Sequence, residues 1–433
     1  MAETITQPAL KTTISRQALT AALGIAGSAV IKTPRARTNK DGKTIPPRPS
    51  KFPQLEGRVR LDLAGDTLTV SSSNYELEIQ VRIPAAEYAG AGGAVVLKLD
   101  ALATAGQFKE DLLTVTQAPA GVTFKAGRLL TRCQYDAGDL TTYPRPAERH
   151  DIDTGKWAWV SAPAVDLARA LAAVLPCSAR SDAREALTAI HVTESADGVF
   201  SVEACDGYRA ARVTVGGAAA LNTREGAAVD WLIPRAAAEA LLAAISASNA
   251  GHISGRAASD ERAAIGVLSN PQRIAAIARD AQITAPAISS RYPPIGGFFQ
   301  PREESAVRVN AGDLLAAVRA AGVLGADLGD PKPKVTIGWS GGALHVASSS
   351  TEYGFADVGI DGRLEGTAPE QPIRLDADML RAALAPLPAG ALVRLGMGKR
   401  GDAIRLSVAG GCDEMASWAY VQMPILGEVK GAK

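Results

Sequence analysis

The sequence is poor in the residue types that mark many kinds of site. Aromatic residues make up only 5% of the 433 residues, so we expect cores built from Leu, Val, Ile and Ala. Its four cysteines lie far apart, at Cys133, Cys177, Cys205 and Cys412. No two of them have the spacing of a zinc knuckle or a redox motif, which argues against a disulfide framework. Reduced thiols are the simplest interpretation.

The chain also lacks an excess of charge and a long apolar run. Its 46 Lys and Arg residues nearly balance 45 Asp and Glu residues, so any basic surface must be offset by acids elsewhere. The most apolar run, 162–176, is interrupted by Asp166 and Arg169 and is shorter than the ~20 residues of a membrane span. Residues 1–13 show no secretory signal pattern. We therefore expect a soluble, cytoplasmic protein with no membrane partner.

Motifs for catalysis and cofactor binding are missing as well. The four histidines, at 150, 191, 252 and 345, are isolated and have no metal-ligand spacing. Cys205 lies beside Asp206 but has no histidine near it in sequence, which favours a small buried residue over a nucleophile. No Gly-Gly pair opens a helix in the manner of a phosphate-binding loop. The sequence predicts a non-catalytic protein without cofactor or metal.

What the sequence does contain is an internal repeat. Ser15, Ser161 and Asn310 each precede an amphipathic stretch, and Ser and Asn are good helix N-caps. These three positions are 146 and then 149 residues apart. Two alternating strands joined by a Gly-containing turn follow each predicted helix, at 58–70, 187–202 and 334–346. The chain therefore contains three similar units.

Each unit has a second half of the same form, a strand followed by a helix and further strands. The predicted helices cover 100–108, 235–245 and 376–384, and the second unit has weaker strands around Ile253 and Ile265. Six half-units, each with one helix and a few antiparallel strands, predict an α+β fold. Its three repeated domains would each pack two helices on antiparallel sheet.

Two features set the limits of the units. Pro, Arg and Glu collect near 144–153 and 301–305, which divides the chain into domains 1–152, 153–303 and 304–433. Segment 32–51 has seven basic residues, one acidic residue and several prolines, without apolar periodicity. It is predicted to be a basic loop within the first domain.

Three motifs and the repeat together carry a resemblance to a known family. Residues 203–209, Glu-Ala-Cys-Asp-Gly-Tyr-Arg, are similar to the family's Ala-Thr-Asp-Gly-His-Arg. Residues 291–295, Arg-Tyr-Pro-Pro-Ile, match its Arg-Phe-Pro-Asp-Tyr, and 420–426, Tyr-Val-Gln-Met-Pro-Ile-Leu, match its Tyr-Val-Val-Met-Pro-Met. In this order, along nearly the whole chain, they resemble the bacterial DNA polymerase III β sliding clamp, a processivity factor.

The resemblance implies a head-to-tail homodimer that forms a six-domain ring around double-stranded DNA, without sequence readout. Helices would line the hole and sheets would form the rim. It also implies a pocket between the second and third domains. Short peptides of the replicative polymerase catalytic subunit, the clamp loader and other proteins with a clamp-binding motif would bind there.

Carried over by position, the peptide pocket consists of one set of residues from the two domains. These are Leu187, Cys205, Gly207, Tyr208, Arg209, Pro293, Phe298, Met379, Val421, Met423, Pro424 and Ile425. The chain departs from the family where Tyr208 replaces a usual His, Ala210 a usual Leu and Met379 a usual aromatic residue, and 426–433 extend past the usual end. For Leu187, an ordinary core position is an equal alternative.

Basic residues on or beside the predicted helices, and in the basic loop, are the candidate DNA contacts. They are Arg16, Lys109, Arg169, Arg180, Arg235, Arg319 and Arg381, together with Arg35, Arg37, Lys40 and Lys43. Phosphate contacts of this kind give affinity without sequence readout. Two alternatives stay open: ordinary solvated arginines on the helices, and a loop without a role.

The predicted function is a DNA sliding clamp that tethers the replicative polymerase and other partners for processive synthesis. The alternative is a phage-borne or extra-copy clamp whose altered partner pocket serves resistance or competition.

Overall fold

The computed structural model describes most of the chain. The described residues are 10–33, 37–38, 44–45, 50–89, 92–118, 121–134, 137–147, 157–181, 184–221, 229–255, 261–269, 272–301, 305–326, 332–350, 353–369, 371–399 and 401–426. They form two compact units. Unit 1 comprises Met1–Ala168, Ala219–Glu225 and Ala236–Ala287, and unit 2 comprises Arg169–Ala218, Gly226–Arg235 and Ile288–Lys433. Because this division falls inside the second predicted repeat, the three-domain boundaries stay a prediction.

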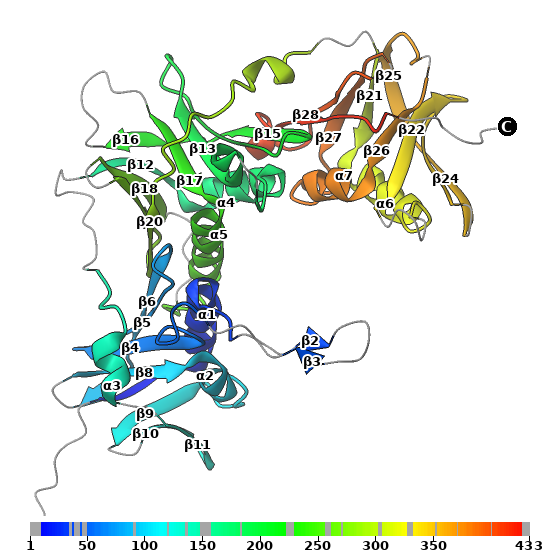
Figure 1. Ribbon diagram of the computed structural model, residues 1–433. Coiled ribbons are helices and arrows are strands. Elements are labelled where there is room, and N and C mark those ends of the chain that lie inside the picture. The colour runs from blue at the N-terminus through cyan, green and yellow to red at the C-terminus, as the bar shows by residue number, and fades with distance from the viewer. Residues whose placement is uncertain are drawn as a thin grey trace, which may run out of the picture. The chain divides into compact units, whose positions relative to one another are not determined.

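Unit 1 is built on two antiparallel sheets (Figure 1). The larger has nine strands in the order β16-β12-β18-β19-β20-β6-β5-β4-β8, and the smaller has five in the order β11-β10-β9-β1-β7. The nine are Ala219–Leu221, Ala158–Pro163, Arg262–Ser269, Gln272–Ile277, Ala281–Pro286, Glu78–Pro84, Thr67–Ser73, Arg58–Ala64 and Gly93–Lys98. The five are Leu129–Cys133, Gly121–Ala126, Leu112–Ala118, Lys11–Ser15 and Glu87–Ala89. The short strands β2 (Arg37–Thr38) and β3 (Thr44–Ile45) pair with each other.

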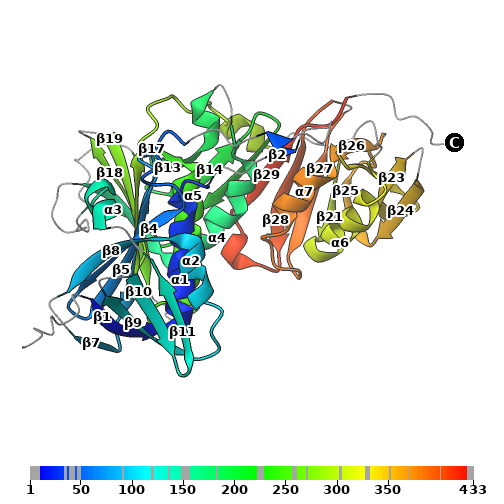
Figure 2. The ribbon, with the colours of Figure 1, turned by 60° about the horizontal axis from the view of Figure 1, so that its bottom comes forward.

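Helices cover one side of these sheets. They are α1 (Arg16–Ala26), α2 (Leu99–Ala105) and α5 (Arg235–Asn249), and a short α3 (Ala137–Thr142) packs against β8. Helix α1 buries Leu19, Leu23 and Ile25, packs on β5 and β6, and contacts α2, which lies beside it in Figure 2. Ile79 and Val81 of β6 are fully buried, as expected where helices cover a sheet face.

Unit 2 repeats this plan. Its nine-stranded sheet has the order β17-β13-β14-β15-β29-β28-β27-β21-β25, and a four-stranded sheet has the order β24-β23-β22-β26. The nine are Asp230–Pro234, Ala189–Glu194, Phe200–Cys205, Arg209–Thr214, Ala419–Gln422, Ile404–Gly410, Leu392–Met397, Ser305–Asn310 and Gly362–Gly366. The four are Gly354–Ile360, Ala343–Ser350, Lys334–Ser340 and Ile373–Asp376. Helices α6 (Ala311–Gly322) and α7 (Ala377–Leu384) pack side by side (Figure 1).

The first helices of the three repeats confirm the period. Ser15 and Asn310 cap α1 and α6 through their side-chain oxygens, as predicted. The prediction for Ser161 was wrong, because Ser161 lies in β12 and its hydroxyl accepts a hydrogen bond from Arg262. The second helix, α4 (Ala164–Val174), begins three residues later. The three helices therefore begin at 16, 164 and 311, which are 148 and 147 residues apart.

A matching hydrogen bond links the first and third repeats. The Ser72 hydroxyl donates to the carbonyl of Ala26 at the end of α1, and the Ser348 hydroxyl donates to that of Ala321 near the end of α6, both at 2.6 Å. Each hydroxyl satisfies a carbonyl that the last helical turn leaves without an intrahelical partner. The two repeats thus share internal detail as well as element order.

The second half-helices occur where the sequence predicts them, although their ends differ. α2 ends at Ala105, α5 continues to Asn249, and Asp376 caps α7 through the amide of Met379. The strand expected around Ile253 was wrong, since the residue is buried in a turn after α5. The α+β class, with helices on antiparallel sheets, is confirmed. Short 3-10 turns occur at Gly27–Ala29, Leu175–Cys177, Glu185–Thr188, Gly296–Phe299 and Asp413–Met415.

Candidate peptide-binding site

The predicted pocket residues all belong to unit 2, and the turn between β14 and β15 is held by side-chain hydrogen bonds. The Asp206 carboxylate accepts hydrogen bonds from the amides of Tyr208 and Arg209, both at 3.0 Å. Gly207 has a φ of 88°, a conformation that costs glycine little. The Asp206 side chain thus caps the turn, and Tyr208 points outward and is 67% exposed.

Arg209 is held in place inside the site. Its Nε donates to the second carboxylate oxygen of Asp206 at 2.9 Å, and its Nη1 donates to the carbonyl of Met379 at 3.4 Å. The arginine therefore joins the turn to helix α7. Arg209 is one of the residues assigned to the predicted pocket, and in the structure its guanidinium connects two parts of the protein.

The end of the chain completes the site by pairing with β15. Val421 lies opposite Ala210 and Gln422 opposite Arg209, and the Met423 amide then donates to the carbonyl of Tyr208 at 2.8 Å. The Ile425 amide donates to the Arg374 carbonyl at 2.8 Å, which ties the segment to β26. Met423 is left 45% exposed beside the turn.

The segment that leads into β21 crosses the outer face of the sheet. Tyr292, Ile295 and Phe299 pack into a cluster with Ala210 and Leu232, and Pro293 lies half-buried beside Tyr292. Phe298 points outward and is 52% exposed. We call residues 288–301 the connector. Because the 3-10 turn Gly296–Phe299 contacts β29, the structure brings Phe298 of the predicted set to the region of the chain end.

The predicted set is not uniformly accessible. Leu187 is buried, so it adds no exposed surface to the predicted pocket. Val421 is buried and Cys205, Met379, Pro424 and Ile425 are half-buried, whereas Gly207, Tyr208, Phe298 and Met423 are exposed. Burial raises the pKa of the Cys205 thiol, which fits the prediction that this cysteine is no nucleophile.

The sequence did not reveal a row of polar residues on the outer face of this sheet. Successive cross-strand pairs place these residues side by side: Arg363, Arg308, Arg394, Ser407, Ala419, Arg212, Glu203 and His191. Directly opposed residues in antiparallel strands lie on one face. We call this set the charged row. The sequence signal for this row was an Arg between apolar residues in β27 and in β28. Only the pairing of the strands shows which residues lie side by side across the sheet.

The connector contacts the charged row at two points and the neighbouring Arg405 at a third. The Tyr292 ring lies on His191, with centroids 4.4 Å apart, and Arg212 lies 4.9 Å from the Phe299 ring centroid. The Nε of Arg405, which lies two residues before Ser407 on β28, donates to the Phe298 carbonyl at 2.7 Å. His191 also hydrogen-bonds Glu203 at 2.8 Å and Asp230 at 2.6 Å. The row therefore fixes the path of the connector.

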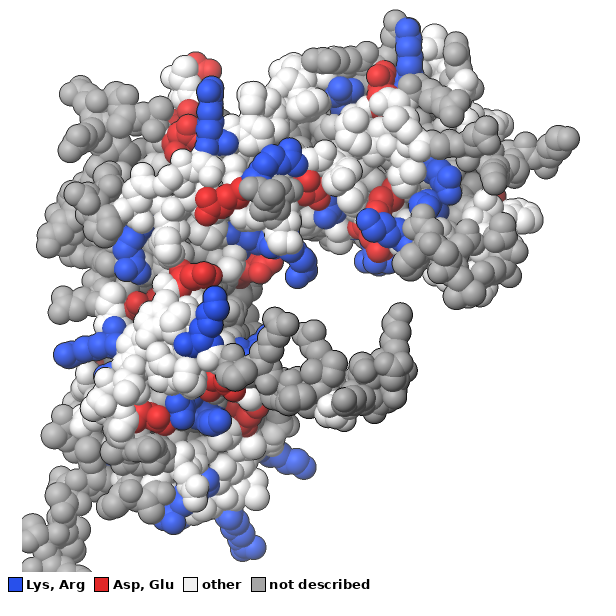
Figure 3. Space-filling model, viewed as in Figure 1, with Lys and Arg blue, Asp and Glu red and all other residues white. Residues whose placement is uncertain are grey.

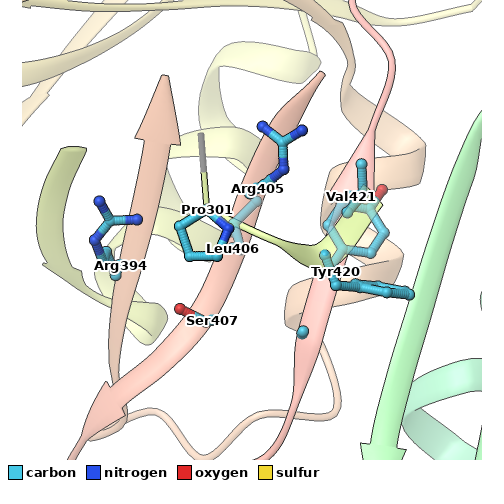
Figure 4. A pocket seen from close by; sticks show the side chains of 9 residues that line it. Pro301, Arg394, Arg405, Leu406, Ser407, Tyr420 and Val421 are labelled. Atoms are coloured by element: carbon cyan, nitrogen blue, oxygen red, sulfur yellow. The ribbon is translucent and has the colours of Figure 1, made fainter. Parts of the chain in front are cut away.

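A small cavity opens where the connector crosses β27, β28 and β29 (Figure 4). Its lining comprises Phe299, Pro301, Arg394, Arg405, Leu406, Ser407, Ala419, Tyr420 and Val421. Of the predicted pocket residues, only Val421 contributes to it. The cavity thus adjoins the predicted site without coinciding with it.

The candidate DNA contacts fall into two groups. Arg16 donates to the carbonyls of Glu110 and Gly106. Arg235 donates to the carbonyls of Leu175 and Ser178. Both side chains therefore bond to the protein's own backbone. Lys109, Arg180, Arg319 and Arg381 are exposed, and Arg169 is half-buried. Arg35, Lys40 and Lys43 lie outside the described residues, as does the side chain of Arg37. In Figure 3 basic and acidic side chains are interspersed on the face shown, without a continuous basic patch.

Within the described part of the chain, no group of three or more His, Cys, Asp or Glu side chains is arranged to hold a metal ion. None of the helices described combines the length and the apolar character that crossing a membrane requires.

Comparison with solved structures identifies the fold. The chain is similar to the DNA polymerase III β subunit of Thermotoga maritima, with a TM-score of 0.71 at 13% identity, covering 97% of this chain and 100% of that one. It is similar to the Pseudomonas aeruginosa DnaN sliding clamp bound to griselimycin, with a TM-score of 0.71 at 18% identity, covering 96% and 100%. The Bacillus subtilis sliding clamp gives 0.69 at 15% identity, with 97% and 100% covered.

No protein-family model matches the sequence, and no curated protein matches it. The chain has the fold of the bacterial DNA polymerase III β sliding clamps, which confirms the resemblance at the level of structure.

Proposed function

We propose that this protein is a DNA sliding clamp, a non-catalytic homodimeric ring that encircles duplex DNA and tethers a replicative polymerase. The observation that carries the proposal is the extent of the structural likeness. It covers 96% of this chain and 100% of the Pseudomonas clamp, so every part of a clamp subunit has a counterpart here. A fold alone does not fix a function, but a ring-forming subunit uses its whole length to close the ring.

The strand order supports ring closure by a second copy. Within unit 1, β6 of the first repeat pairs with β20 of the second, and within unit 2, β15 of the second pairs with β29 of the third. In both seams, the third strand in the first half of one repeat pairs with the third strand in the second half of the next repeat. The equivalent third strands of the two remaining half-units are β24, in the first half of the third repeat, and β11, in the second half of the first repeat. Each is an edge strand of its described sheet.

These two edges have the character of an interface. Leu130 on β11 is 61% exposed and Phe355 on β24 is 79% exposed, which is unusual for large apolar side chains on edge strands. We propose that β11 of one copy pairs with β24 of the other. The pairing repeats the seam already seen twice within the chain and gives a head-to-tail dimer.

The exposed basic residues of the helices are the proposed DNA contacts, with Lys109, Arg180, Arg319 and Arg381 first among them. Sparse cations hold a duplex through interchangeable phosphates and allow sliding. Substituting one of them by Ala should reduce the slope of log affinity against log salt by about 1. Removal of segment 32–51 should flatten the slope further, and an unchanged slope would exclude that segment from the DNA contact.

The polymerase catalytic subunit, the clamp loader and other partners are proposed to bind at Tyr208, Phe298 and Met423. These exposed apolar side chains flank the capped turn and the chain end. Met adapts to varied partner surfaces, which suits a site that serves several proteins in turn.

Two measurements test the ring. Light scattering of the full chain should give a dimer, and Leu130→Arg should give a monomer by placing a charge in the β11 seam. Tyr88→Arg is the matched control, since Tyr88 is an exposed residue on β7, the opposite edge of the same sheet. A wild-type monomer at micromolar concentration contradicts the proposal.

Loading tests sliding and tethering. With the cognate clamp loader and ATP, the protein should stay on circular plasmid and be lost when the plasmid is cut, and it should lengthen products of the cognate polymerase. Equal retention on linear and circular DNA excludes encirclement. Retention without stimulation of any polymerase tested instead favours the extra-copy or phage-borne alternative.

A further inference from the structure

Each of the two seams inside the chain contains a pair of residues whose place in the repeat can be identified. In unit 1, Ile79 of β6 lies directly opposite Ile283 of β20. In unit 2, Ala211 of β15 lies directly opposite Tyr420 of β29. Each of these strands also pairs with a strand of its own half-unit. Those pairings show whether the two pairs are equivalent.

The strands from the first half of each repeat align through the hairpin that contains them. In each hairpin, one residue of the third strand lies opposite the residue two positions after a buried valine: Ile79 opposite Ser72, Ala211 opposite Ala204 and Ala356 opposite Ser348. The hydroxyls of Ser72 and Ser348 donate to matching helix carbonyls, which supports this alignment. Ala356 of β24 therefore occupies the place of Ile79 and Ala211.

The strands from the second half of each repeat align in the same way. In each hairpin, one residue of the third strand lies opposite a buried residue two positions after a buried Val or Ile: Ile283 opposite Ala276, Tyr420 opposite Leu406 and Thr131 opposite Phe124. In unit 1, Thr131 and Ile283 are also each the third residue of a strand that follows a two-residue turn. Thr131 of β11 therefore occupies the place of Ile283 and Tyr420.

Both seams thus join the same two places of the repeat, and β11 and β24 carry the same places at free edges. We infer that β11 of one copy pairs with β24 of a second copy in this register, antiparallel, with Thr131 opposite Ala356. Leu130 then lies opposite Asp357, and Arg132 lies opposite Phe355. The inference rests on the proposed function, because it requires that two copies join at these edges, and it names the residues that meet.

The register continues the inner faces of the two sheets across the seam. Thr131 lies opposite Phe124, which is fully buried, and Ala356 lies opposite Ser348, which hydrogen-bonds to α6. Directly opposed residues of antiparallel strands share a face, so Thr131 and Ala356 both belong to inner faces. A slip of one residue would place inner residues of one copy against outer residues of the other.

On the outer face, the register brings together side chains that are exposed in the single chain. Leu130 and Phe355 become diagonal neighbours, and so do Arg132 and Asp357, at a spacing that long side chains can bridge. Asp357 also hydrogen-bonds His345 of its own chain at 3.0 Å, which holds its carboxylate on this face. A slip of two residues in either direction keeps one of these two contacts and separates the other pair.

Disulfide trapping between full-length chains tests the register. Directly opposed residues have Cα atoms about 4.5–5.5 Å apart, within the range that a disulfide spans, whereas diagonal neighbours are about 7–8 Å apart. A chain with Leu130→Cys is mixed in turn with chains carrying Asp357→Cys, Phe355→Cys or Gly359→Cys. These three positions of β24 are exposed and lie on one face. Diamide is the oxidant, and each variant alone and the wild type give the background from the native cysteines.

The covalent dimer should form with Asp357→Cys and stay near background with Phe355→Cys and Gly359→Cys. A second series uses Arg132→Cys in place of Leu130→Cys. Here the covalent dimer should form with Phe355→Cys and stay near background with Asp357→Cys, because the opposed residue changes by two positions. The change of partner between the series separates a fixed register from a difference in cysteine reactivity.

The remaining outcomes contradict the inference in distinguishable ways. Stronger trapping of Leu130→Cys by Phe355→Cys or Gly359→Cys, or equal trapping by all three, overturns the register and leaves the pairing of the two edges in place. A dimer in light scattering that neither series traps above background overturns the pairing of β11 with β24. A wild-type monomer overturns the proposed ring, and the inference with it.

Discussion

The two seams between repeats, one in each unit, follow the same plan but differ in what surrounds them. In unit 1, β6 and β20 pair over four residues, and Ile79, Val81 and Ile283 at that seam are all fully buried. In unit 2, β15 and β29 also pair over four residues, but exposed Tyr208 and Met423 lie at one end. Tyr75 is also exposed at the turn of unit 1, but only the seam of unit 2 adds an exposed residue from the chain end, Met423. We call the seam of unit 1 sealed and the seam of unit 2 open.

The turns beside these seams show where the difference arises. The Asn74 side chain accepts from the amides of Glu76 and Leu77, as the Asp206 side chain does from those of Tyr208 and Arg209. Both turns have a residue in left-handed conformation, Tyr75 in unit 1 and Gly207 in unit 2. After the turn, unit 1 places buried Leu77 where unit 2 places Arg209. A conserved turn geometry thus serves packing in one seam and a polar link to α7 in the other.

The comparison shows that the candidate site is built on a strand pairing that also occurs where no site is predicted. The repeat supplies the backbone of this pairing in both units. The residues after the turn, the connector and the chain end distinguish the seam of unit 2 from that of unit 1. Substitutions in the sealed seam should therefore affect stability, and substitutions at the open seam should mainly affect binding.

The largest expected effect is in the sealed seam. Ile79→Ala or Ile283→Ala should lower the free energy of unfolding of unit 1 by about 2–5 kcal/mol through lost burial and a cavity. Met423→Ala at the open seam should change stability by less than about 0.5 kcal/mol, because the side chain is exposed, yet weaken peptide binding. Urea unfolding and fluorescence polarisation measure the two. Comparable destabilisation by both substitutions would remove the distinction between the seams.

A smaller effect is expected at the turn residues. Asp206→Ala should cost about 1–3 kcal/mol, because it removes the turn hydrogen bonds and leaves Arg209 without its partner carboxylate. Asn74→Ala should cost about 1 kcal/mol, since only the turn bonds are lost. Asp206→Asn separates the contributions: it keeps the acceptor oxygen and removes the ion pair. Equal costs for Asp206→Ala and Asn74→Ala, by urea unfolding, would mean that the Arg209 link adds no stability.

The left-handed positions should respond in opposite directions. Gly207→Ala should destabilise by about 1 kcal/mol, because a Cβ is disfavoured at its φ of 88°. Tyr75 has a φ of 71°, so Tyr75→Gly should relieve the same backbone strain in unit 1 and raise stability. The substitution also removes the ring contact with Phe52, which acts in the opposite direction. Thermal midpoints check both. Destabilisation by Tyr75→Gly as large as that by Gly207→Ala would show that the Phe52 contact outweighs the strain.

The smallest effect concerns pH and unit 2 alone. Burial acts to lower the pKa of His191, but hydrogen bonds to Glu203 and Asp230 outweigh it, so its pKa lies above the ordinary value. The stabilisation is therefore complete below about pH 6.5 and is lost as pH rises through the higher pKa of the folded state. Urea midpoints between about pH 6 and 9 should fall with rising pH in the wild type. The His191→Gln variant should lack this slope, and an unaltered slope in the variant would assign it to other groups.

Much of the fold could be predicted from the sequence because its signals are local. Ser15 and Asn310 cap helices as expected, since each lies directly before an amphipathic stretch. Ser161 failed because a residue 101 positions away, Arg262, donates to its hydroxyl, and β12 continues through it. Local capping chemistry cannot reveal such a long-range competitor.

The candidate site was predictable in part for the same reason. The turn at Asp206 and the end at Met423 carry short motifs, and they do meet through the bond from the Met423 amide to the Tyr208 carbonyl. The burial of Leu187 and the engagement of Arg209 depend on packing with distant elements. The cavity at Arg394 and Arg405 exists only because the connector crosses three strands, which no motif records.

The two unlike edges, β11 and β24, have a consequence for assembly in the cell. An interface between different surfaces is heterologous, so each added copy presents a new free edge until the first and last meet. In the proposed dimer the free edges of the second copy meet those of the first, whereas copies whose free edges do not meet continue into a filament. A variant with only one edge blocked, such as Leu130→Arg, would end growth at whichever copy it joins. Co-produced with the intact chain, it should therefore inhibit assembly of the proposed dimer, because a pair of copies with one blocked edge cannot close.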